Sequence, residues 1–277
     1  MNIQFLGTGA AEGIPALFCQ CPLCRKAEAA GGREIRTRCG ALVNNRILID
    51  LTPDIFLHKL RFGLDLSEVE GVVDMIPAAV ELGIVTAIGH SGADYETSLK
   101  AIEQGAAVAT HTFNAMGLLH QHRPAIMGAV LESDVYCEMI CDGRHLHPAA
   151  VRMLIKTKGL DRVVAITDSI MAAGLPDGKY HLGVNEVVVE DGDAKLADTG
   201  VRAGSTLTQD TALRNLIAFT GRPIEELLPA LTENPARLIG VFDRKGSIAD
   251  GKDADLVVLD GEKRVDMVFC RGRMLEK

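Results

Sequence analysis

The stretch IVTAIGH at 84–90 is followed along the chain by AAVATHTFNAM at 106–116, DVYCEMICDG at 134–143 and RVVAITDS at 162–169. Each contains a short apolar or β-branched run, which is typical of a buried strand. Amphipathic segments alternate with them, including ADYETSLKAIEQG at 93–105 and PAAVRMLIKTKG at 148–159. Strands that alternate with helices indicate successive parallel βα units. The sequence therefore predicts an α/β fold built on a parallel sheet.

The C-terminal part of the chain predicts further helices and a small β layer. AGSTLTQDTALRNLIAFTG at 203–221 predicts a loop that runs into a helix, followed by EELLPALTENPARLIG at 225–240. Leu207, Leu213, Leu216 and Ile217 have helical spacing and are expected in the core. ADLVVLD at 254–260 and VDMVFCRG at 265–272 predict two strands.

The N-terminal part has a different rhythm. IQFLG at 3–7 predicts a strand, and CGALVNN at 39–45 with RILIDLT at 46–52 predicts a β-hairpin that turns at Asn44 and Asn45. Residues 1–70 carry eight Lys or Arg and eight Asp or Glu, so the whole net charge of −8 falls on residues 71–277. We therefore expect two unlike pieces, 1–69 and 70–277, with no internal repeat.

Composition excludes several classes of function. The chain has 277 residues, of which 47% are hydrophobic, and no apolar run approaches the length of a membrane span. It is acidic and lacks a block of basic residues, which argues against nucleic-acid binding. The start MNIQFLGTG does not resemble a secretion signal, so we expect a cytoplasmic protein whose seven cysteines are thiols.

Three polar residues close predicted parallel strands. His90 ends IVTAIGH, His111 ends AAVATH and Asp168 ends RVVAITD. Loops after parallel strands converge on one mouth, where βα architectures place their sites. Imidazole and carboxylate are ligands that zinc prefers, and such an ion lowers the pKa of a bound water to about 7. The alternative is that each histidine only forms a hydrogen bond at the end of its strand.

A series of motifs then resembles one enzyme family. GHSGADYE (89–96), THTFNAM (110–116), CDGRHLHP (141–148), ITDSIMAAGLPDGKY (166–180), ENPARLIG (233–240) and KGSIADGKDADLVVLD (245–260) follow one another as in the N-acetylglucosamine-6-phosphate deacetylase family of the amidohydrolase superfamily. The resemblance covers about residues 71–277. It implies a TIM-type (β/α)8 barrel with a small β-sandwich, and hydrolysis of the acetamide of N-acetylglucosamine 6-phosphate to glucosamine 6-phosphate and acetate. It also implies a divalent metal, foremost zinc, and a homodimer.

The resemblance also implies roles for single residues. His90 and His111 match the family's metal-binding histidines. Asp168 matches its catalytic aspartate, which takes a proton from the attacking water and gives it to the departing amine. This proton transfer is chemically sound, because the amine cannot leave a tetrahedral intermediate without a proton.

Four further positions match the part of the family's site that holds the substrate. Asn114 and Ala115 match a turn that binds the sugar phosphate, and His145 matches a substrate-binding histidine. The family's phosphate-binding arginine falls on His122, or on Arg123 after a one-residue adjustment. We favour Arg123, because guanidinium is charged at any working pH; the alternative is a solvated loop arginine.

The chain holds only part of the family pattern. The 207 residues after residue 70 supply about four βα units, which match the second half of the barrel. The HxH motif of the first barrel strand and the metal-binding glutamate of the HLEGP motif have no counterpart. We therefore expect a partial barrel with a C-terminal β-sandwich remnant and open sheet edges, which favour poor stability. The alternative to a deacetylase is a non-catalytic fusion or remnant of two truncated hydrolases.

The first 69 residues resemble a different family. FLGTGAAEGIPALFCQCPLCRKA (5–27), RTRCGALV (36–43) and ILIDLTPD (47–54) resemble the opening of a metallo-β-lactamase-fold phosphodiesterase of phosphonate metabolism. That resemblance implies a β-hairpin fragment of this fold, without the HxHxDH motif that would follow. It also implies a structural zinc on Cys19, Cys21 and Cys24, whose fourth ligand in such relatives comes from a later segment without a counterpart here. Cys39 is our own candidate for that ligand, and the alternative is that these cysteines are loose thiols.

The remaining chemically interesting residues have simpler interpretations. We expect Cys137 and Cys141 to be small buried hydrophobes and Asp253 to be a turn residue. His147 and His181 are expected on the surface or behind the site.

Overall fold

A four-stranded parallel sheet forms the centre of the molecule. The computed structural model describes residues 3–7, 22–30, 40–43, 47–49, 72–182 and 185–275. The sheet has the order β4 (Ala87–Ile88), β5 (Val108–Ala109), β6 (Tyr136–Ile140) and β7 (Val163–Ile166). Every neighbouring pair is parallel. The predicted α/β fold and parallel sheet are confirmed, with β4 and β5 shorter than the apolar runs from which they were predicted.

Helices between the strands cover the sheet. They are α3 (Val72–Glu81), α4 (Tyr95–Glu103), α5 (Ala125–Glu132), α6 (Pro148–Lys158) and the 3₁₀ turn η2 (Leu160–Arg162). Asp94 caps α4 by accepting a hydrogen bond from the Thr97 N–H at 2.8 Å. The ammonium group of Lys158 is buried beneath the end of α5, where it donates to the carbonyls of Val130 and Ser133. These hydrogen bonds join the C-terminal end of α6 to the C-terminal end of α5.

The core lies between the sheet and these helices. Its fully buried side chains come from one face of β6, from α5 and α6, and from the C-terminal helices: Met127, Cys137, Met139, Leu154, Leu213, Leu216 and Leu227. Leu207, Leu213 and Leu216 are buried as predicted, and Ile217 packs against them. Side chains alternate across a strand, so the other face of β6 carries Tyr136 and Glu138, which are only partly buried.

Residues 178–182 and 185–196 form a three-stranded antiparallel sheet that the sequence analysis missed. β8 (Gly178–Leu182), β9 (Asn185–Glu190) and β10 (Asp193–Leu196) pair in sequence order. Asp191 and Gly192 join β9 to β10 at φ of 49° and 72°. An Asp-Gly pair between apolar strands is a strong hairpin signal, because both residues of a type I′ turn need positive φ. That signal was present in VVVEDGDAKL at 187–196.

The C-terminal segment adds helices and one further sheet. The helices are α7 (Gln209–Thr220), α8 (Ile224–Leu227), η3 (Leu228–Leu231) and α9 (Glu233–Leu238). β11 (Leu256–Leu259), β12 (Val265–Cys270) and β13 (Arg273–Met274) form a single antiparallel layer. Val257 and Met274 are each 58% exposed. The described residues therefore form one layer of the expected sandwich remnant.

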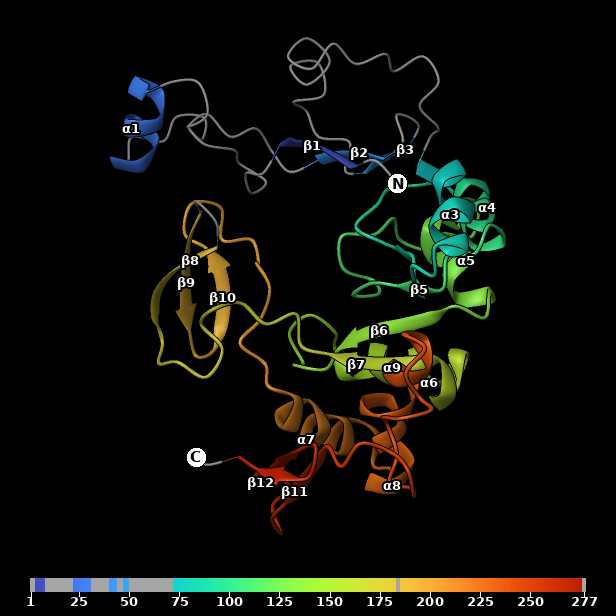
Figure 1. The fold of residues 1–277 in the computed structure, drawn as a ribbon, viewed down its shortest axis with the longest axis vertical. Coiled ribbons are helices and arrows are strands. Elements are labelled where there is room, and N and C mark those ends of the chain that lie inside the picture. The colour runs from blue at the N-terminus through green and yellow to red at the C-terminus, as the bar shows by residue number, and fades with distance from the viewer. Residues whose placement is uncertain are drawn as a thin grey trace.

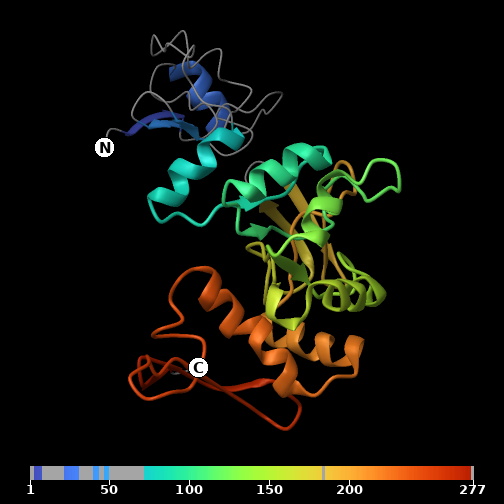
Figure 2. The ribbon, with the colours of Figure 1, turned by 90° about the vertical axis from the view of Figure 1, so that its right-hand side faces the viewer.

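The N-terminal strands form a sheet of their own. β1 (Ile3–Gly7), β2 (Gly40–Val43) and β3 (Ile47–Ile49) are antiparallel, and α1 (Pro22–Ala30) lies between β1 and β2 in sequence. The predicted pairing of the two hairpin strands is confirmed, whereas Asn44 and Asn45 lie outside the described residues. Both views place this sheet and the β11–β13 sheet at opposite ends of the molecule (Figures 1 and 2).

The edges of the parallel sheet differ. At the β4 edge, Ile84 and Val85 are 52% and 41% exposed. At the β7 edge, the carbonyls of Val163 and Ala165 accept side-chain amide hydrogens from Asn234 and Gln209. Within the described residues, β1–β3 pairs with neither edge. In the same residues, no helix combines the length and the apolar character needed to cross a membrane.

Candidate active site

The three predicted strand-end residues all lie at the carboxyl end of the parallel sheet. His90 follows β4, His111 follows β5 and Asp168 follows β7. Each has positive φ, at 48°, 29° and 51° respectively. Positive φ is uncommon for residues other than glycine, and strained backbone of this kind clusters at functional sites. They are three of the nine non-glycine residues with positive φ among the described residues.

The rings of His90 and His111 lie next to each other. Their centroids are 5.5 Å apart in an edge-to-face arrangement. His90 is exposed, whereas Nδ1 of His111 is buried and has no hydrogen-bond partner among the described residues. A buried ring nitrogen without a partner is costly unless it binds something.

This pair fits the imidazole part of a metal site. Adjacent imidazoles are common ligands of zinc and similar ions. In the part of the chain that the structure describes, no group of three His, Cys, Asp or Glu side chains is placed to hold one ion. His90 and His111 could therefore offer two ligands, and Asp168 does not join them as a third in this arrangement.

Glu138 on β6 supports the end of β5, which the sequence analysis did not predict. Its Oε2 accepts a hydrogen bond from Thr110 Oγ1 at 2.8 Å and one from the His111 N–H at 3.3 Å. Gly89 lies against the same threonine, since a Cβ at this position would be 2.5 Å from Thr110 Cγ2. Tight packing at Thr110 thus sets where the backbone of His111 lies.

Asp168 is held by its backbone and leaves its carboxylate exposed. Its carbonyl accepts a hydrogen bond from the Ser205 N–H at 2.7 Å. Gly204 has φ of 60°, and a Cβ there would lie 3.0 Å from the Asp168 oxygen and 2.5 Å from Ile170 Cγ2. The carboxylate itself is exposed and has no hydrogen-bond partner among the described residues.

The turn after His111 is built by Asn114. Its side-chain amide donates to the carbonyls of His111 and Thr112 at 3.1 and 3.3 Å, and its backbone N–H donates to His111 at 3.0 Å. In this structure the Asn114 N–H is therefore used within the turn, and its role toward an anion stays a prediction. Ala115 is exposed with φ of 49°, and its N–H has no partner among the described residues.

The loop that follows carries both candidates for the phosphate-binding position. The Arg123 N–H donates to the His120 carbonyl at 3.0 Å, which closes a turn around His122. The rings of His120 and His122 lie 5.5 Å apart. His122 and Arg123 are both exposed, so the preference for Arg123 remains a prediction.

His145 lies in the loop after β6, paired with a residue that was not predicted. Asp142 Oδ2 is 2.6 Å from His145 Nδ1, and both side chains are about nine-tenths buried. Asp142 Oδ1 accepts the N–H groups of Arg144 and His145 at 2.8 and 2.7 Å. Asp142 directly follows a buried strand, so the rule that identified His90, His111 and Asp168 also applies to it.

A buried ion cluster ties this loop to the β8–β10 sheet. Asp193 on β10 accepts two hydrogen bonds from Arg202, at 2.7 and 2.9 Å, and its carboxylate is 9% exposed. Arg144 lies 3.5 Å from the same carboxylate, and Arg202 also donates to the Arg144 carbonyl at 3.2 Å. The hydrogen bonds from Arg202 and Lys195 hold the pKa of Asp193 well below its usual range, although burial opposes this.

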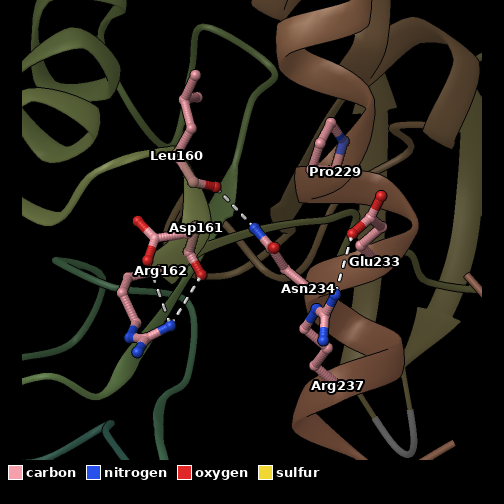
Figure 3. Close-up of a pocket in the computed structure, with 7 residues that line it drawn as sticks. All are labelled: Leu160, Asp161, Arg162, Pro229, Glu233, Asn234 and Arg237. Atoms are coloured by element: carbon pink, nitrogen blue, oxygen red, sulfur yellow. Dashed lines mark hydrogen bonds and ion pairs between the residues drawn. The ribbon is translucent and has the colours of Figure 1, made fainter. Parts of the chain in front are cut away.

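A hollow in the described residues lies away from these side chains. It has a volume of about 520 Å³ and lies at the amino end of β7 (Figure 3). Its lining comes from η2, η3 and α9: Leu160, Asp161, Arg162, Pro229, Glu233, Asn234 and Arg237. Its charged groups form pairs, Arg162 with Asp161 and Arg237 with Glu233, each at 3.4 Å. Both amide hydrogens of Asn234 are donated to carbonyls, so the hollow presents little unused binding chemistry.

The remaining predicted residues have structural roles. Cys137 and Cys141 are buried as expected, and burial raises the pKa of Cys141 to about 12. His147 is exposed and caps α6, and His181 is exposed on β8. Asp253 pairs with Arg244 and Lys245. Cys24 is buried on α1, whereas Cys19, Cys21 and Cys39 lie outside the described residues.

Known proteins resemble this chain over the same region. Residues 61–275 match the amidohydrolase family. N-acetylglucosamine-6-phosphate deacetylase of Bacillus subtilis is 38% identical over 192 residues, which cover 69% of this chain and 48% of the relative. N-acetylgalactosamine-6-phosphate deacetylase of Escherichia coli is 35% identical over 218 residues, covering 78% and 57%.

A solved structure gives the same result. That of N-acetylglucosamine-6-phosphate deacetylase from Thermotoga maritima superposes with a TM-score of 0.70 at 39% identity, and the match covers 75% of this chain and 56% of that one. The chain spans about half the length of the curated relatives it matches. Over residues 61–275, it belongs to the amidohydrolase family.

Proposed function

We propose that this chain carries the second half of the active site of an amino-sugar 6-phosphate deacetylase. The reaction would convert N-acetylglucosamine 6-phosphate to glucosamine 6-phosphate and acetate. The observation that carries the proposal is the strained carboxyl edge, where His90, His111 and Asp168 all have positive φ. The names of the relatives add the substrate class, since those reported above are deacetylases of a hexosamine 6-phosphate.

His90 and His111 would hold a divalent metal, for which zinc is our first candidate. A divalent ion at this place supplies Lewis acidity toward a carbonyl oxygen and acidifies water. The unpartnered Nδ1 of His111 supports this assignment. The third ligand would come from outside the described arrangement, because the part of the chain seen in the structure brings no third donor to the pair.

Asp168 would move the proton. Water adds to the acetamide carbon and loses a proton to the Asp168 carboxylate, and the same carboxyl group then protonates the nitrogen as the C–N bond breaks. One carboxyl group can serve both steps because the first leaves it protonated for the second. Its exposure and its lack of a partner among the described residues support this role.

Residues on two loops would bind the sugar phosphate. The Ala115 N–H and the guanidinium of Arg123 are the anion donors that we propose on the loop after β5, with Asn114 building the turn. His145, on the loop after β6, would contact the sugar. We further propose a homodimer in the cytoplasm as the working form.

The N-terminal segment keeps its separate interpretation. We propose two units, 1–69 and 70–277, with the first a fragment of a metallo-β-lactamase fold that holds a zinc ion on Cys19, Cys21 and Cys24. The separate β1–β3 sheet supports two units. The match to the amidohydrolase family begins at residue 61, just before the proposed boundary at residue 70, and limited proteolysis would locate that boundary.

A non-catalytic remnant is the second candidate. It is favoured by the two-ligand pair at His90 and His111 and by the span of about half the relatives' length. The two candidates separate by acetate release from N-acetylglucosamine 6-phosphate with added zinc. The deacetylase predicts release that falls by about 10²- to 10⁴-fold in Asp168→Asn. If neither protein releases acetate, the chain is a non-catalytic remnant.

A further inference from the structure

The loop after β6 holds a carboxylate whose two oxygens have different tasks. Oδ1 of Asp142 accepts two backbone N–H groups, from Arg144 and His145. Oδ2 lies 2.6 Å from Nδ1 of the His145 ring. Because both backbone N–H groups donate to Oδ1, rotation of the carboxylate would break both hydrogen bonds.

This arrangement decides which ring nitrogen bears a proton. Burial opposes ionisation of Asp142, but hydrogen bonds from the His145 ring and from the two N–H groups outweigh it and lower the pKa of this carboxyl group. An ionised carboxylate is only an acceptor, so the proton in the short contact belongs to Nδ1. In the neutral ring, Nε2 is then a bare acceptor.

The loop itself is fixed from two sides. Asn215 on α7 donates to the Cys141 carbonyl at 2.8 Å, directly before Asp142. Arg202 donates to the Arg144 carbonyl at 3.2 Å while its guanidinium pairs with buried Asp193. These contacts restrict motion of the segment that carries both members of the Asp142–His145 pair.

We propose that Asp142 is a positioning residue that holds the proton of His145 on Nδ1, so that Nε2 accepts a hydrogen bond from a hydroxyl group of the bound sugar. The hydroxyl partner rests on the proposed function. The position of the proton does not, because it follows from contacts within the chain.

Asp142→Asn tests the proposal, because it should move the His145 ring proton from Nδ1 to Nε2. The two backbone donors require an oxygen at the place of Oδ1, so the new amide nitrogen must take the place of Oδ2. That nitrogen donates a hydrogen bond, which forces Nδ1 to accept and moves the ring proton to Nε2. The change in size is negligible.

The readout is the pair of ring ¹⁵N shifts of His145, in the full chain at about pH 8.5, above the ordinary histidine pKa. We expect Nδ1–H in the wild type, Nε2–H in Asp142→Asn, and no change in Asp161→Asn, a matched control at an exposed carboxylate. Nε2–H in the wild type would overturn the proposal, whether or not the variant folds. The same tautomer in both proteins would also overturn it.

Calorimetry with glucosamine 6-phosphate tests the sugar contact. An Nε2 that donates cannot accept from a hydroxyl, so we expect affinity to fall about tenfold in Asp142→Asn. Unchanged affinity with the proton moved to Nε2 would show that sugar binding does not need an accepting Nε2, and would overturn this part of the proposal. If no protein binds the sugar phosphate, the proposed function fails and the hydroxyl contact fails with it, while the nitrogen shifts still decide the assignment of Asp142.

Discussion

The two ends of the parallel sheet differ in whether their polar side chains have hydrogen-bond or ion-pair partners. At the amino end of β7, the hollow of about 520 Å³ is lined by charges that already form pairs and by an amide with both hydrogens donated. At the carboxyl end, Nδ1 of His111 and the carboxylate of Asp168 lack partners among the described residues, and the backbone is strained. Polar groups without partners, rather than the presence of a hollow, therefore mark the candidate site.

The largest expected effect on stability belongs to the amino end. Asn234→Ala removes two hydrogen bonds of 2.7 Å and leaves the carbonyls of Leu160 and Val163 short of a donor beside the core. We expect a loss of about 3 kcal/mol in the free energy of unfolding. Denaturant titration measures it, with Arg237→Lys as the control on the same helix. A loss below about 0.5 kcal/mol would show that this end is not held by paired groups.

The ion cluster beside the site should make stability depend on pH. The folded pKa of Asp193 is depressed, so its contribution is present above the unfolded value near 3.9 and is lost as pH falls through the folded value. Asp193→Asn should cost about 2 kcal/mol at pH 7. The difference between the two proteins should shrink below about pH 4. A difference that stays constant from pH 7 to acid would exclude an ionised Asp193 as its source.

A smaller effect separates strain from crowding at the carboxyl end. Gly204 and Gly221 have φ of 60° and 66°, but only at Gly204 would a Cβ meet neighbours, at Ile170 and the Asp168 carbonyl. Both changes to alanine add backbone strain, of about 1 kcal/mol. We expect Gly204→Ala to cost about 1 kcal/mol more than Gly221→Ala in thermal unfolding. Equal costs would mean that the Asp168 turn has room to move.

Periodicity and strand-end polarity predicted much of this molecule. Four strands, the helices α4, α6 and α7, and the positions of His90, His111 and Asp168 follow from local pattern, because alternation of βα units fixes where strand ends lie. The β8–β10 sheet was missed, although the Asp191-Gly192 pair predicts the turn between β9 and β10. Its role was harder to foresee, since Asp193 meets Arg144 only through the tertiary fold.

Partners across long sequence distances explain the other omissions. Glu138 supports His111 from a neighbouring strand, and no spacing in the sequence indicates that contact. The used N–H of Asn114 is a detail of turn geometry that composition does not specify. The prediction of poor stability from open edges is untested, and a sharp, cooperative melt of a single species would contradict it.

The most direct test of the account is a zinc titration of the His90–His111 pair. Calorimetry would use the chain with Cys19→Ser and Cys21→Ser, which removes the proposed cysteine site, and the same chain with His90→Asn, His111→Asn or the exposed control His181→Asn. The account predicts one zinc ion per chain, lost with either His90 or His111 and retained with His181→Asn. Zinc binding that survives both His90→Asn and His111→Asn, or no binding in the parent chain, would contradict it.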